Sequence, residues 1–475
     1  MLDEAAAPSR RGLDPTAIGD ALLTRELARQ IGELTFEAIS PTARTIAGQC
    51  VLDNLGVTIA GVDEPAARIV RDTVSDDWGQ GTTRLVGTRF SASARDASLA
   101  NGTAAHALDF DDVSVMMGGH PTATVLPAAL SVGEEVAGSG RDLVRSVVAG
   151  IECSARVGSA LGDSHYARGF HTTATAGCVG AAAAAASMMR LSIAKTGAAL
   201  GIAATHASGL KSMFGTMSKP LHAGKAAQAG VLAAKLAARG FDSAERALEG
   251  EQGLLSVLSE DPNYAELTRP FGKPWAVSDL LFKFHSACYL THAAIESALT
   301  LRSQGLDPTH VDAIEVVVPR GHLSVCAIPE PATGLEGKFS LSYVTALALV
   351  VGKARESEFT DALVANPAIV SVRDQVRVTT NDDMPKLSSV VVVHDRTGRR
   401  WQASTDVSNS AWKDSPEEQH SALSEKFDAL VSSRLGDSRT RELLELLGDL
   451  EHLESIAELT ALTVPRGQPH SNTQL

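Results

Sequence analysis

Apolar residues recur at helical spacing through most of the first 270 residues. Leu23, Leu27 and Ile31 form one such stripe, which Leu22 and Leu34 extend. A second stripe follows Ser40-Pro41, a pair typical of a helix N-cap and first helical position, and Gly61 ends it. The same spacing predicts helices over residues 94–108, 141–161, 172–189, 193–206 and 223–239. We therefore expect a large helical domain over residues 16–273, with one short strand at 82–87 and an unstructured stretch before residue 16.

The pattern changes near Pro274. Alternating apolar and polar residues predict strands at 311–319, 371–379, 388–395 and 400–407, with helices at 286–304 and 343–352 between them. This is the pattern of an α+β module over residues 274–407. Ser415-Pro416 then opens a helical segment within 408–463, in which Ser438 is the expected N-cap of a last helix reaching residue 459. A polar tail from Gly467 is expected to be disordered.

Composition narrows the class of protein. A hydrophobic content of 44% with 21% charged residues is typical of a soluble globular chain, and the net charge of −14 argues against nucleic acid or an anionic membrane as partner. The first residues lack the apolar core of a signal peptide, so we expect a cytoplasmic protein. Five scattered cysteines without a CxxC pair disfavour a disulfide framework, a zinc knuckle and an iron–sulfur cluster. Helices rich in small residues, such as the six alanines at 181–186, are expected to pack closely.

One stretch concentrates polar chemistry beside an Ala-rich helix. Residues 209–230 carry Lys219 and His222 among several glycines, and Pro220 fixes the backbone after the lysine. We expect Lys219 on a constrained loop corner at the start of a helix, a place that suits an anionic ligand. Taken alone, the stretch is better explained as a connecting loop with a solvated lysine.

Two other places carry candidate chemistry. Asp109 to Asp112, with His120 downstream, have residue types that bind a divalent ion, although an acidic cluster at a helix end is more often solvated or capping. His171 precedes the Ala-rich helix, where an imidazole and free amides together cradle a carboxylate, or where it is a simple cap. Tyr166 is a weaker candidate for proton transfer, and Asp53 is expected to be a surface or capping residue.

Five segments together resemble the MmgE/PrpD family, and the similarity extends over nearly the whole chain. They are VLDNLGVTIAG at 51–61, NGTAAHALDFDD at 101–112, GGHPTATVLPA at 118–128, RGFHTTATAG at 168–177 and GTMSKPLHAGKAAQAG at 215–230. Members of this family include 2-methylcitrate dehydratases, cis-aconitate decarboxylases and iminodisuccinate epimerases, which act on small polycarboxylates without a redox cofactor.

The resemblance implies a fold and a site. The fold is mainly α, a large all-helical domain with an inserted α+β lid domain. The last helices return to pack on the helical domain. The resemblance implies a homodimer, no cofactor and no metal. It makes Asp109, His120, His171, Lys219 and Tyr343 catalytic, with Lys283, Tyr166 and His222 binding the substrate. In this hypothesis Lys219 and His171 polarise carboxylates, His120 with Asp109 exchanges a proton, and Lys283 and Tyr343 complete the site on lid closure.

The chain departs from two of the family's patterns. Asp111-Asp112-Val113 and Thr122-Ala123 differ from the dehydratase pattern, and the decarboxylases carry threonine where this chain has Val113. We predict a cofactor-independent lyase, foremost a dehydratase, that acts on a citrate- or aconitate-like acid through proton transfer at the carbon α to a carboxylate. The alternatives are a decarboxylase, an epimerase of an imino- or amino-dicarboxylate, and a non-catalytic carboxylate-binding protein.

Overall fold

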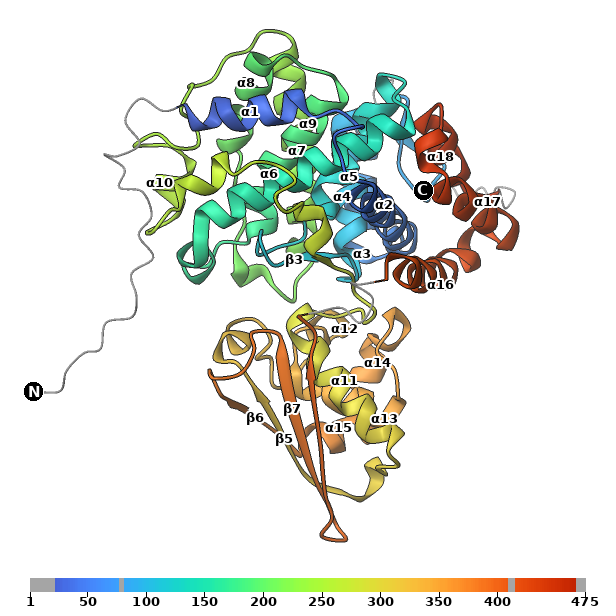
Figure 1. Cartoon of the computed structure of the whole chain (residues 1–475). Helices are drawn as coiled ribbons and strands as arrows, with labels where there is room; N and C mark the ends of the chain where they lie inside the picture. The colour runs from blue at the N-terminus through green and yellow to red at the C-terminus, as the bar shows by residue number, and fades with distance from the viewer. Residues whose placement is uncertain (1–21, 77–80, 409–414, 467–475) are drawn as a thin grey trace, which may run out of the picture.

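The computed structural model describes residues 22–76, 81–408 and 415–466. Figure 1 shows two bodies, a large helical one above and a smaller α+β one below. The chain is mainly α-helical, as the hydrophobic pattern predicts, with helices α1 to α18 in the described part. The stretches expected to be disordered at the two ends lie largely outside the described residues.

The helical body is built from three groups of helices. The first comprises α1 (Leu23–Glu33), α2 (Pro41–Gly61), α3 (Pro65–Asp76), α4 (Ala94–Ala107) and α5 (Thr122–Glu135). The second comprises α6 (Gly140–Ala167), α7 (Thr172–Met188), α8 (Ile193–Ala204), α9 (Ser218–Ala238) and α10 (Leu254–Leu258). The C-terminal group comprises α16 (Pro416–Leu435), α17 (Asp437–Gly448) and α18 (Ile456–Leu462).

Helix α7 is the centre of this body. All 17 of its residues are buried, and it packs against α5, α6, α8 and α9. Alanine permits such close crossings because its side chain ends at the β-carbon, while it also favours the helical backbone. The run of six alanines is therefore a packing surface, as predicted.

Helices α4 and α9 cross at two glycines. A β-carbon on Gly102 would lie 2.8 Å from the α-carbon of Gly224, and one on Gly224 would lie 2.3 Å from the carbonyl oxygen of Leu99. Only glycine fits at such a distance, since ordinary non-bonded contacts are longer. This crossing sets the spacing between the two helices that carry part of the candidate site.

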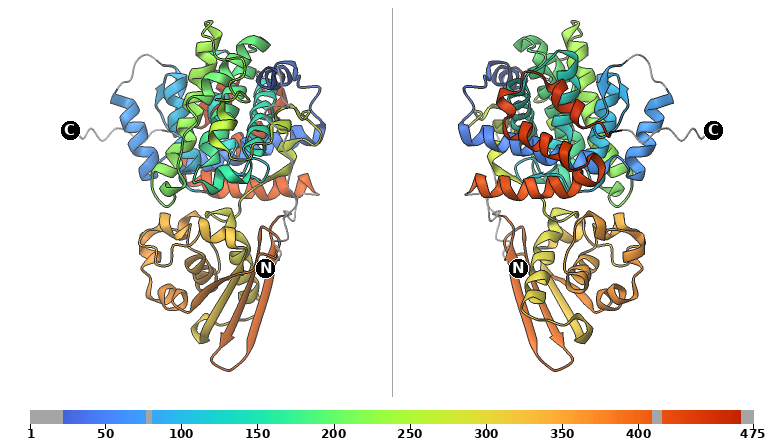
Figure 2. Two further views of the ribbon diagram at one scale, coloured as in Figure 1. Left: turned by 90° about the vertical axis from the view of Figure 1, so that its left-hand side faces the viewer. Right: turned by 90° about the vertical axis from the view of Figure 1, so that its right-hand side faces the viewer.

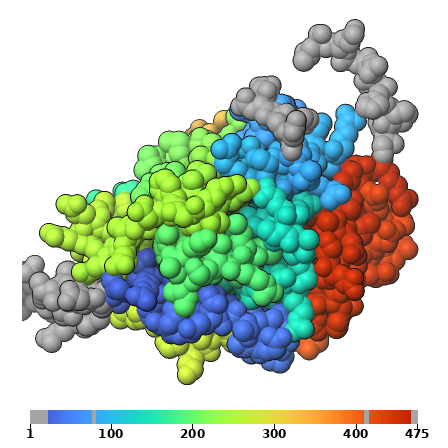
Figure 3. Space-filling model, turned by 90° about the horizontal axis from the view of Figure 1, so that it is seen from above, coloured from blue at the N-terminus to red at the C-terminus, as the bar shows by residue number. Residues whose placement is uncertain are grey.

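The C-terminal helices lie on the helical body. Helix α16 packs along α2, and α18 contacts α5. Figure 2 shows α16 along the lower side of the helical body, and Figure 3 shows the red C-terminal helices as one flank of it. A buried ion pair of 2.6 Å between Lys426 on α16 and Asp53 on α2 joins the two segments. Asp53 is 4% exposed, so its expected surface or capping role is wrong.

The α+β body has a four-stranded sheet in the order β6-β5-β7-β8. Its strands are β5 (Val311–Val318), β6 (Val376–Thr380), β7 (Ser388–Asp395) and β8 (Arg400–Asp406). Strand β5 runs parallel to β6 and antiparallel to β7, which is antiparallel to β8. Helices α11 (Tyr289–Ser303) and α13 (Leu341–Val351) pack on the sheet, with the short α12 (Gly334–Gly337), α14 (Asp361–Val364) and α15 (Pro367–Arg373) beside them (Figure 1).

Two-residue strands complete the helical body and its junction. They are β1 (Thr83–Arg84), β2 (Ser91–Ala92), β3 (Val113–Ser114) and β4 (Leu280–Leu281). Strand β3 follows α4, β4 precedes the α+β body, and the two pair antiparallel. This short pairing brings the segment after α4 next to the chain that enters the α+β body.

Several predicted boundaries are wrong for identifiable reasons. The loop expected at 162–169 is largely helix, because α6 continues to Ala167 across a break at Gly162, whose φ is 68°. Part of the strand expected at 371–379 is helix α15, since Asn366-Pro367 caps a helix there. Gly436, rather than Ser438, precedes α17, which ends at Gly448. Within the described residues no single helix is long and apolar enough to cross a membrane, and α2 with α3 meets that test only as a pair bent by 81°.

Candidate active site

The candidate site lies where the two bodies meet. Asp109 ends the turn after α4 with a positive φ of 51°, a conformation that few residues other than glycine, asparagine and aspartate adopt. The pairing of β3 with β4 places the strand that leads to Lys283 beside this turn. Helix α9 supplies Lys219 from its first turn.

Asp109 binds two lysines with one carboxylate. Lys219 Nζ lies 2.7 Å from Asp109 Oδ2, and Lys283 Nζ donates to Asp109 Oδ1 and, at 2.8 Å, to its carbonyl oxygen. All three residues are at most 4% exposed. Burial alone would raise the pKa of Asp109, but the two ammonium groups hold it well below its usual value. Burial likewise opposes the charge on Lys283, yet Asp109 raises the pKa of that lysine. The group carries one excess positive charge.

A second carboxylate faces two imidazoles. Asp111 accepts from His106 Nδ1 at 2.9 Å, and its Oδ2 lies 3.3 Å from His120 Nδ1. The same nitrogen of His120 lies 2.8 Å from the carbonyl oxygen of Asp112. Because a carbonyl only accepts, Nδ1 of His120 carries the hydrogen, and its Nε2 holds the lone pair of the neutral ring.

Burial keeps these imidazoles neutral. It lowers the pKa of His106 to about 4 and lowers that of His120, although Asp111 opposes both shifts. Burial would raise the pKa of Asp111, but the imidazoles opposite it hold it well below its usual value. At neutral pH, Asp111 is thus ionised and the two rings are neutral, with a lone pair at Nε2.

A second pair of imidazoles completes the group. His171 is the residue before α7, and its Nδ1 lies 3.0 Å from Nδ1 of His222 on α9. One of the two rings donates a hydrogen bond to the other. The ring of His171 lies 6.0 Å from that of His106. Burial, followed by the charge of Lys219, lowers the pKa of His171 well below its usual value and that of His222 to about 4.

Two phenylalanines cover Lys219 from opposite bodies. Phe214 precedes α9, Phe339 belongs to the α+β body, and their rings stack at 5.8 Å between centroids. Lys219 Nζ lies 5.6 Å from the first ring and 5.2 Å from the second. The charged cluster is therefore shielded from water where the two bodies meet.

Six of the predicted site residues gather in this cluster: Asp109, His120, His171, Lys219, Lys283 and His222. The partner of His120 is Asp111, whereas Asp109 binds the lysines. Lys219 lies within a helix rather than on a loop corner, because α9 begins at Ser218 and tolerates Pro220 in its first turn.

The two predicted tyrosines are placed differently: Tyr343 lies outside the cluster, whereas Tyr166 is near enough to Asp109 for that carboxylate to help raise its pKa. Tyr343 is fully buried in the α+β body, and its hydroxyl donates to the carbonyl oxygen of Glu358 at 3.3 Å. Tyr166, near the end of α6, packs on the core of the α+β body, with Lys211 Nζ 3.8 Å from its ring centroid. Burial raises the pKa of both tyrosines, which disfavours them as proton donors in this arrangement.

Two residues of the cluster were not among the predicted catalytic or substrate-binding residues, His106 and Asp111. Both belong to the segment NGTAAHALDFDD, so the resemblance contained the signal. His106 is the last-turn histidine of α4, and Asp111 follows five residues later, after the chain reverses at Asp109. Their contact depends on that reversal, which helical spacing does not predict.

His106, Asp111 and His120 also form a potential metal-ligand set. Their ligand atoms lie within 4.8 Å of one another, and two imidazoles with one carboxylate suit a divalent transition metal. In this arrangement, however, Asp111 and the carbonyl of Asp112 accept the ring hydrogens that a metal would have to displace. The group fits a hydrogen-bonded dyad of imidazoles better than a metal centre.

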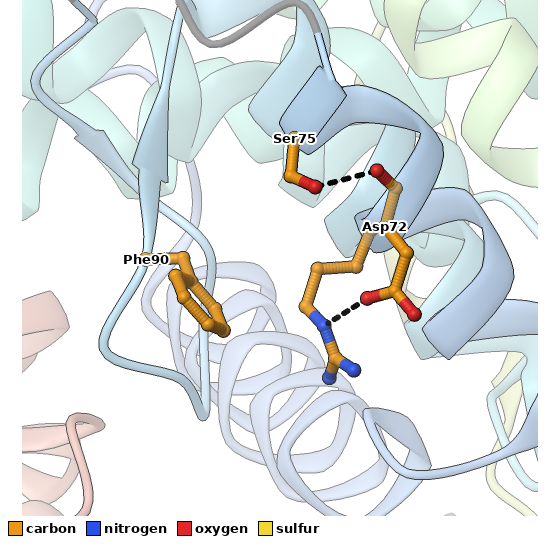
Figure 4. A pocket seen from close by; sticks show the side chains of 4 residues that line it. Asp72, Ser75 and Phe90 are labelled. Atoms are coloured by element: carbon orange, nitrogen blue, oxygen red, sulfur yellow. Dashed lines mark hydrogen bonds and ion pairs between the residues drawn. The ribbon is translucent and has the colours of Figure 1, made fainter. Parts of the chain in front are cut away.

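Two cavities lie elsewhere on the helical body. One of about 320 Å³ is lined by Arg71, Asp72, Ser75 and Phe90. Arg71 donates to the carboxylate of Asp72, and Ser75 Oγ donates to the backbone carbonyl oxygen of Asp72 (Figure 4). The other, of about 300 Å³, lies between α2, α6, α16 and α17 and includes Arg44 and His420. Both are lined by residues other than those of the charged cluster, which remains the candidate active site.

Comparison with known proteins finds matches over most of the chain. The sequence model of the MmgE/PrpD N-terminal domain matches residues 25–267, and that of the MmgE/PrpD C-terminal domain matches residues 285–451. The chain belongs to the MmgE/PrpD family. Relatives include the cis-aconitate decarboxylase of Homo sapiens, 27% identical with 94% of each chain covered. Another is the cis-aconitate decarboxylase of Aspergillus terreus, 24% identical with 93% of this chain and 95% of the relative covered. This MmgE/PrpD protein is an enzyme of the lyase class, as predicted.

Proposed function

We propose that the protein decarboxylates a cis-aconitate-like tricarboxylate without a cofactor. The observation that carries the proposal is the group of Lys219, Lys283 and Asp109, whose excess positive charge lies beside neutral imidazoles in a shielded junction. The carboxylates of such an acid are suitable partners for these two ammonium groups. The names of the curated relatives support this substrate class.

The reaction needs charge stabilisation and one proton. As the bond to the departing carboxylate breaks, CO₂ leaves and its electron pair spreads over the double bond to a remaining carboxylate. Lys219 and Lys283 lie where they stabilise that enediolate charge. His120, protonated beforehand to the imidazolium, then delivers a proton from Nε2 to carbon. Asp111 balances the positive charge that the imidazolium carries before this step. The bound anion itself raises the pKa of His120 toward the value this role requires.

Dehydration is the second candidate, because the imidazoles are neutral before the substrate binds. A neutral His120 accepts a proton from the carbon α to a carboxylate and passes it to the β-hydroxyl, which leaves as water while the electron pair of the C–H bond forms the double bond. The same first step, followed by return of the proton to the opposite face, gives an epimerase. In each case the lysines stabilise the same kind of charge.

Access to the site requires the two bodies to part. Phe214 and Phe339 stack across the junction and cover Lys219, so an acid reaches the lysine only when these rings separate. We therefore propose that the α+β body acts as the lid. Closure after binding would exclude water from the charge that develops.

Proton NMR in D₂O tests the reaction directly. The full-length protein is incubated with EDTA and, in separate tubes, with cis-aconitate, citrate, 2-methylcitrate and iminodisuccinate. We expect CO₂ loss and a deuterated product from cis-aconitate. A product from citrate or 2-methylcitrate would instead establish dehydration, and deuterium uptake by iminodisuccinate would establish epimerisation.

His120→Asn is the matched control for this experiment. The amide of asparagine takes the place of Nδ1 and preserves the bond to the carbonyl of Asp112, while the proton-carrying Nε2 is lost. We expect the folded variant to lose turnover. Full turnover by this variant would contradict the proposed role of His120, and binding without turnover by the wild-type protein would indicate a non-catalytic carboxylate-binding protein.

We also propose a cytoplasmic protein that forms a homodimer; the homodimer rests on the family resemblance alone. Light scattering coupled to size-exclusion chromatography checks the assembly, and a single-chain mass would contradict it.

A further inference from the structure

His106 has one ring nitrogen that the protein does not use. Its Nδ1 faces Asp111, whereas Nε2 is buried and has no hydrogen-bond partner in the part of the chain that the structure describes. The residue itself is 1% exposed. A buried polar atom without a partner costs stability, so such an atom in a native site calls for an explanation.

The contacts of the ring fix which nitrogen holds the hydrogen. Both oxygens of Asp111 lie 2.9 Å from Nδ1 of His106, so Nδ1 donates to the carboxylate. The neutral ring then has a lone pair at Nε2, which points away from Asp111. His106 thus presents an acceptor, and its ring lies 4.6 Å from that of His120.

We propose that Nε2 of His106 accepts a hydrogen bond from an O–H group of the bound acid. This inference rests on the proposed function, because it takes the charged cluster to be a polycarboxylate site. His106 is then a substrate-binding residue that accepts a hydrogen bond from the protonated oxygen of the acid, whereas the lysines bind its ionised oxygens. The role needs no movement of Asp111, which already holds the ring.

The neighbouring groups leave this role to the ligand. The rings of His120 and His171 flank that of His106. Asp111 bonds the other nitrogen of His106, Nδ1, and the ammonium group of Lys219 donates to Asp109. An ionised carboxylate oxygen at Nε2 would place two acceptors against each other, which is unfavourable. The partner must therefore donate, and the O–H donors of a polycarboxylic acid are a hydroxyl or a protonated carboxyl.

Two ligands that differ by one hydroxyl test the inference. Citrate and tricarballylate share the propane-1,2,3-tricarboxylate skeleton, and only citrate has the hydroxyl. Calorimetric titration of the full-length protein at about pH 7.5 should show citrate binding about two- to tenfold more tightly, the range of one neutral hydrogen bond. The measurement reports binding, so it does not depend on turnover.

Two substitutions separate the ring nitrogens. His106→Asn keeps an N–H donor near the position of Nδ1 and removes Nε2, so the preference for citrate should disappear while the bond to Asp111 remains. His106→Gln reaches the position of Nε2 with an amide oxygen and loses the bond to Asp111, so part of the preference should survive. A merely structural role of His106 predicts the reverse order, with His106→Asn closer to the wild-type protein.

His322→Gln serves as the control. His322 is also a buried histidine, and its Nε2 bonds the carbonyl oxygen of Lys386 within the α+β body. Glutamine keeps a donor near that position, so the preference for citrate should be unchanged. A similar loss in this variant would show that the effect of His106→Asn is not specific to the site.

The acidity of the solution distinguishes the two O–H sources. If the donor is a carboxyl proton, citrate and tricarballylate bind equally at about pH 7.5, and both bind several-fold more tightly at about pH 5.5 to the wild-type protein than to His106→Asn. Absence of a difference between the wild-type protein and His106→Asn under both conditions overturns the inference alone. Failure of citrate, tricarballylate and cis-aconitate to bind overturns the proposed function, and the inference with it.

Discussion

Asp109 is the residue on which the charge balance of the junction depends. Its carboxylate is the shared anion of Lys219 and Lys283, and all three side chains are buried. Asparagine at this position keeps the positive φ accessible but removes the negative charge. We expect Asp109→Asn to lower the free energy of unfolding by about 3–5 kcal/mol, because two ammonium groups remain buried without a counter-ion. Urea unfolding at neutral pH measures this loss.

The pH dependence of that stability follows from the lowered pKa of Asp109. The stabilisation is fully present above the pKa of the unfolded chain, about 3.9, and is lost as the pH falls from there toward the lower pKa of the folded state. The wild-type protein should therefore lose stability below about pH 4 more steeply than Asp109→Asn. Parallel curves for the two proteins would show that the carboxylate is not held ionised by the lysines.

Asp111 acts on the chemistry through two imidazoles. It accepts from His106 and lies beside Nδ1 of His120, and its charge raises the pKa of both rings against the effect of burial. Asp111→Asn removes that charge and one acceptor. We expect turnover to fall by about 100-fold or more, since the proton-transferring ring loses its orientation and charge balance.

The pH–rate profile distinguishes this role from a purely structural one. Without Asp111 the pKa of His120 falls, so the limb of the profile that His120 controls should move to lower pH. Loss of turnover with an unmoved limb would mean that Asp111 only supports the fold. The residual activity of Asp111→Asn, measured at several pH values, is sufficient for comparison with the wild-type profile.

At the scale of elements, the crossing of α4 and α9 sets the distance between His106 and Lys219. A β-carbon on Gly224 would lie 2.3 Å from both the carbonyl oxygen of Leu99 and Oγ1 of Thr103. Gly224→Ala must push the helices apart, and we expect a loss of about 1–3 kcal/mol or more in the free energy of unfolding together with lower turnover. Thermal unfolding and the product assay measure the two effects.

Gly48→Ala is the matched control for this crossing. Gly48 also lies inside a helix, α2, but a β-carbon there meets nothing within 4 Å. Alanine should stabilise this helix by up to about 1 kcal/mol and leave turnover unchanged, because it reduces the entropy of the unfolded chain without a clash. Equal stability changes in the two variants would contradict the packing argument.

Helices with caps and a clear apolar pattern were predictable from the sequence. Ser40 caps α2 and Ser415 caps α16, each followed by a proline, as predicted. The errors fall where tertiary packing outweighs local signals. Gly162 was interpreted as the start of a loop, yet α6 resumes beyond it because its last turns pack against neighbouring segments.

The site was predictable in part for a similar reason. Residue types pointed to Asp109, His120, His171 and Lys219, and the family resemblance added Lys283. The pairing of Asp111 with His106 and His120 depends on the reversed chain at Asp109, which spacing along the sequence does not show. Asp53 was misplaced because its partner, Lys426, lies 373 residues away on the returning helix α16.

At the scale of the whole molecule, the two bodies share a contact at the end of α4. The carbonyl oxygen of Leu108 accepts from Ser286 Oγ at 2.7 Å and from Lys338 Nζ, which also lies 3.2 Å from Ser286 Oγ. Lys338 belongs to the α+β body and is 5% exposed. The contact therefore places a buried ammonium group, bonded only to neutral oxygens in these interactions, at the junction next to the site.

Lys338 makes the stability of the molecule depend on alkaline pH. Burial lowers its pKa from 10.5 to about 8, although Asp109 opposes the shift. Between these values the unfolded chain binds a proton that the folded protein has released, so the free energy of unfolding rises with pH. Lys338→Met lacks this rise, because methionine fills similar space without titrating. From about pH 7 to about pH 9.5, the wild-type protein should gain about 2 kcal/mol relative to the variant in urea unfolding. A constant difference over that range would mean that Lys338 stays charged in the folded protein, and that the neutral oxygens of Leu108 and Ser286 suffice to solvate an ammonium group between the two bodies.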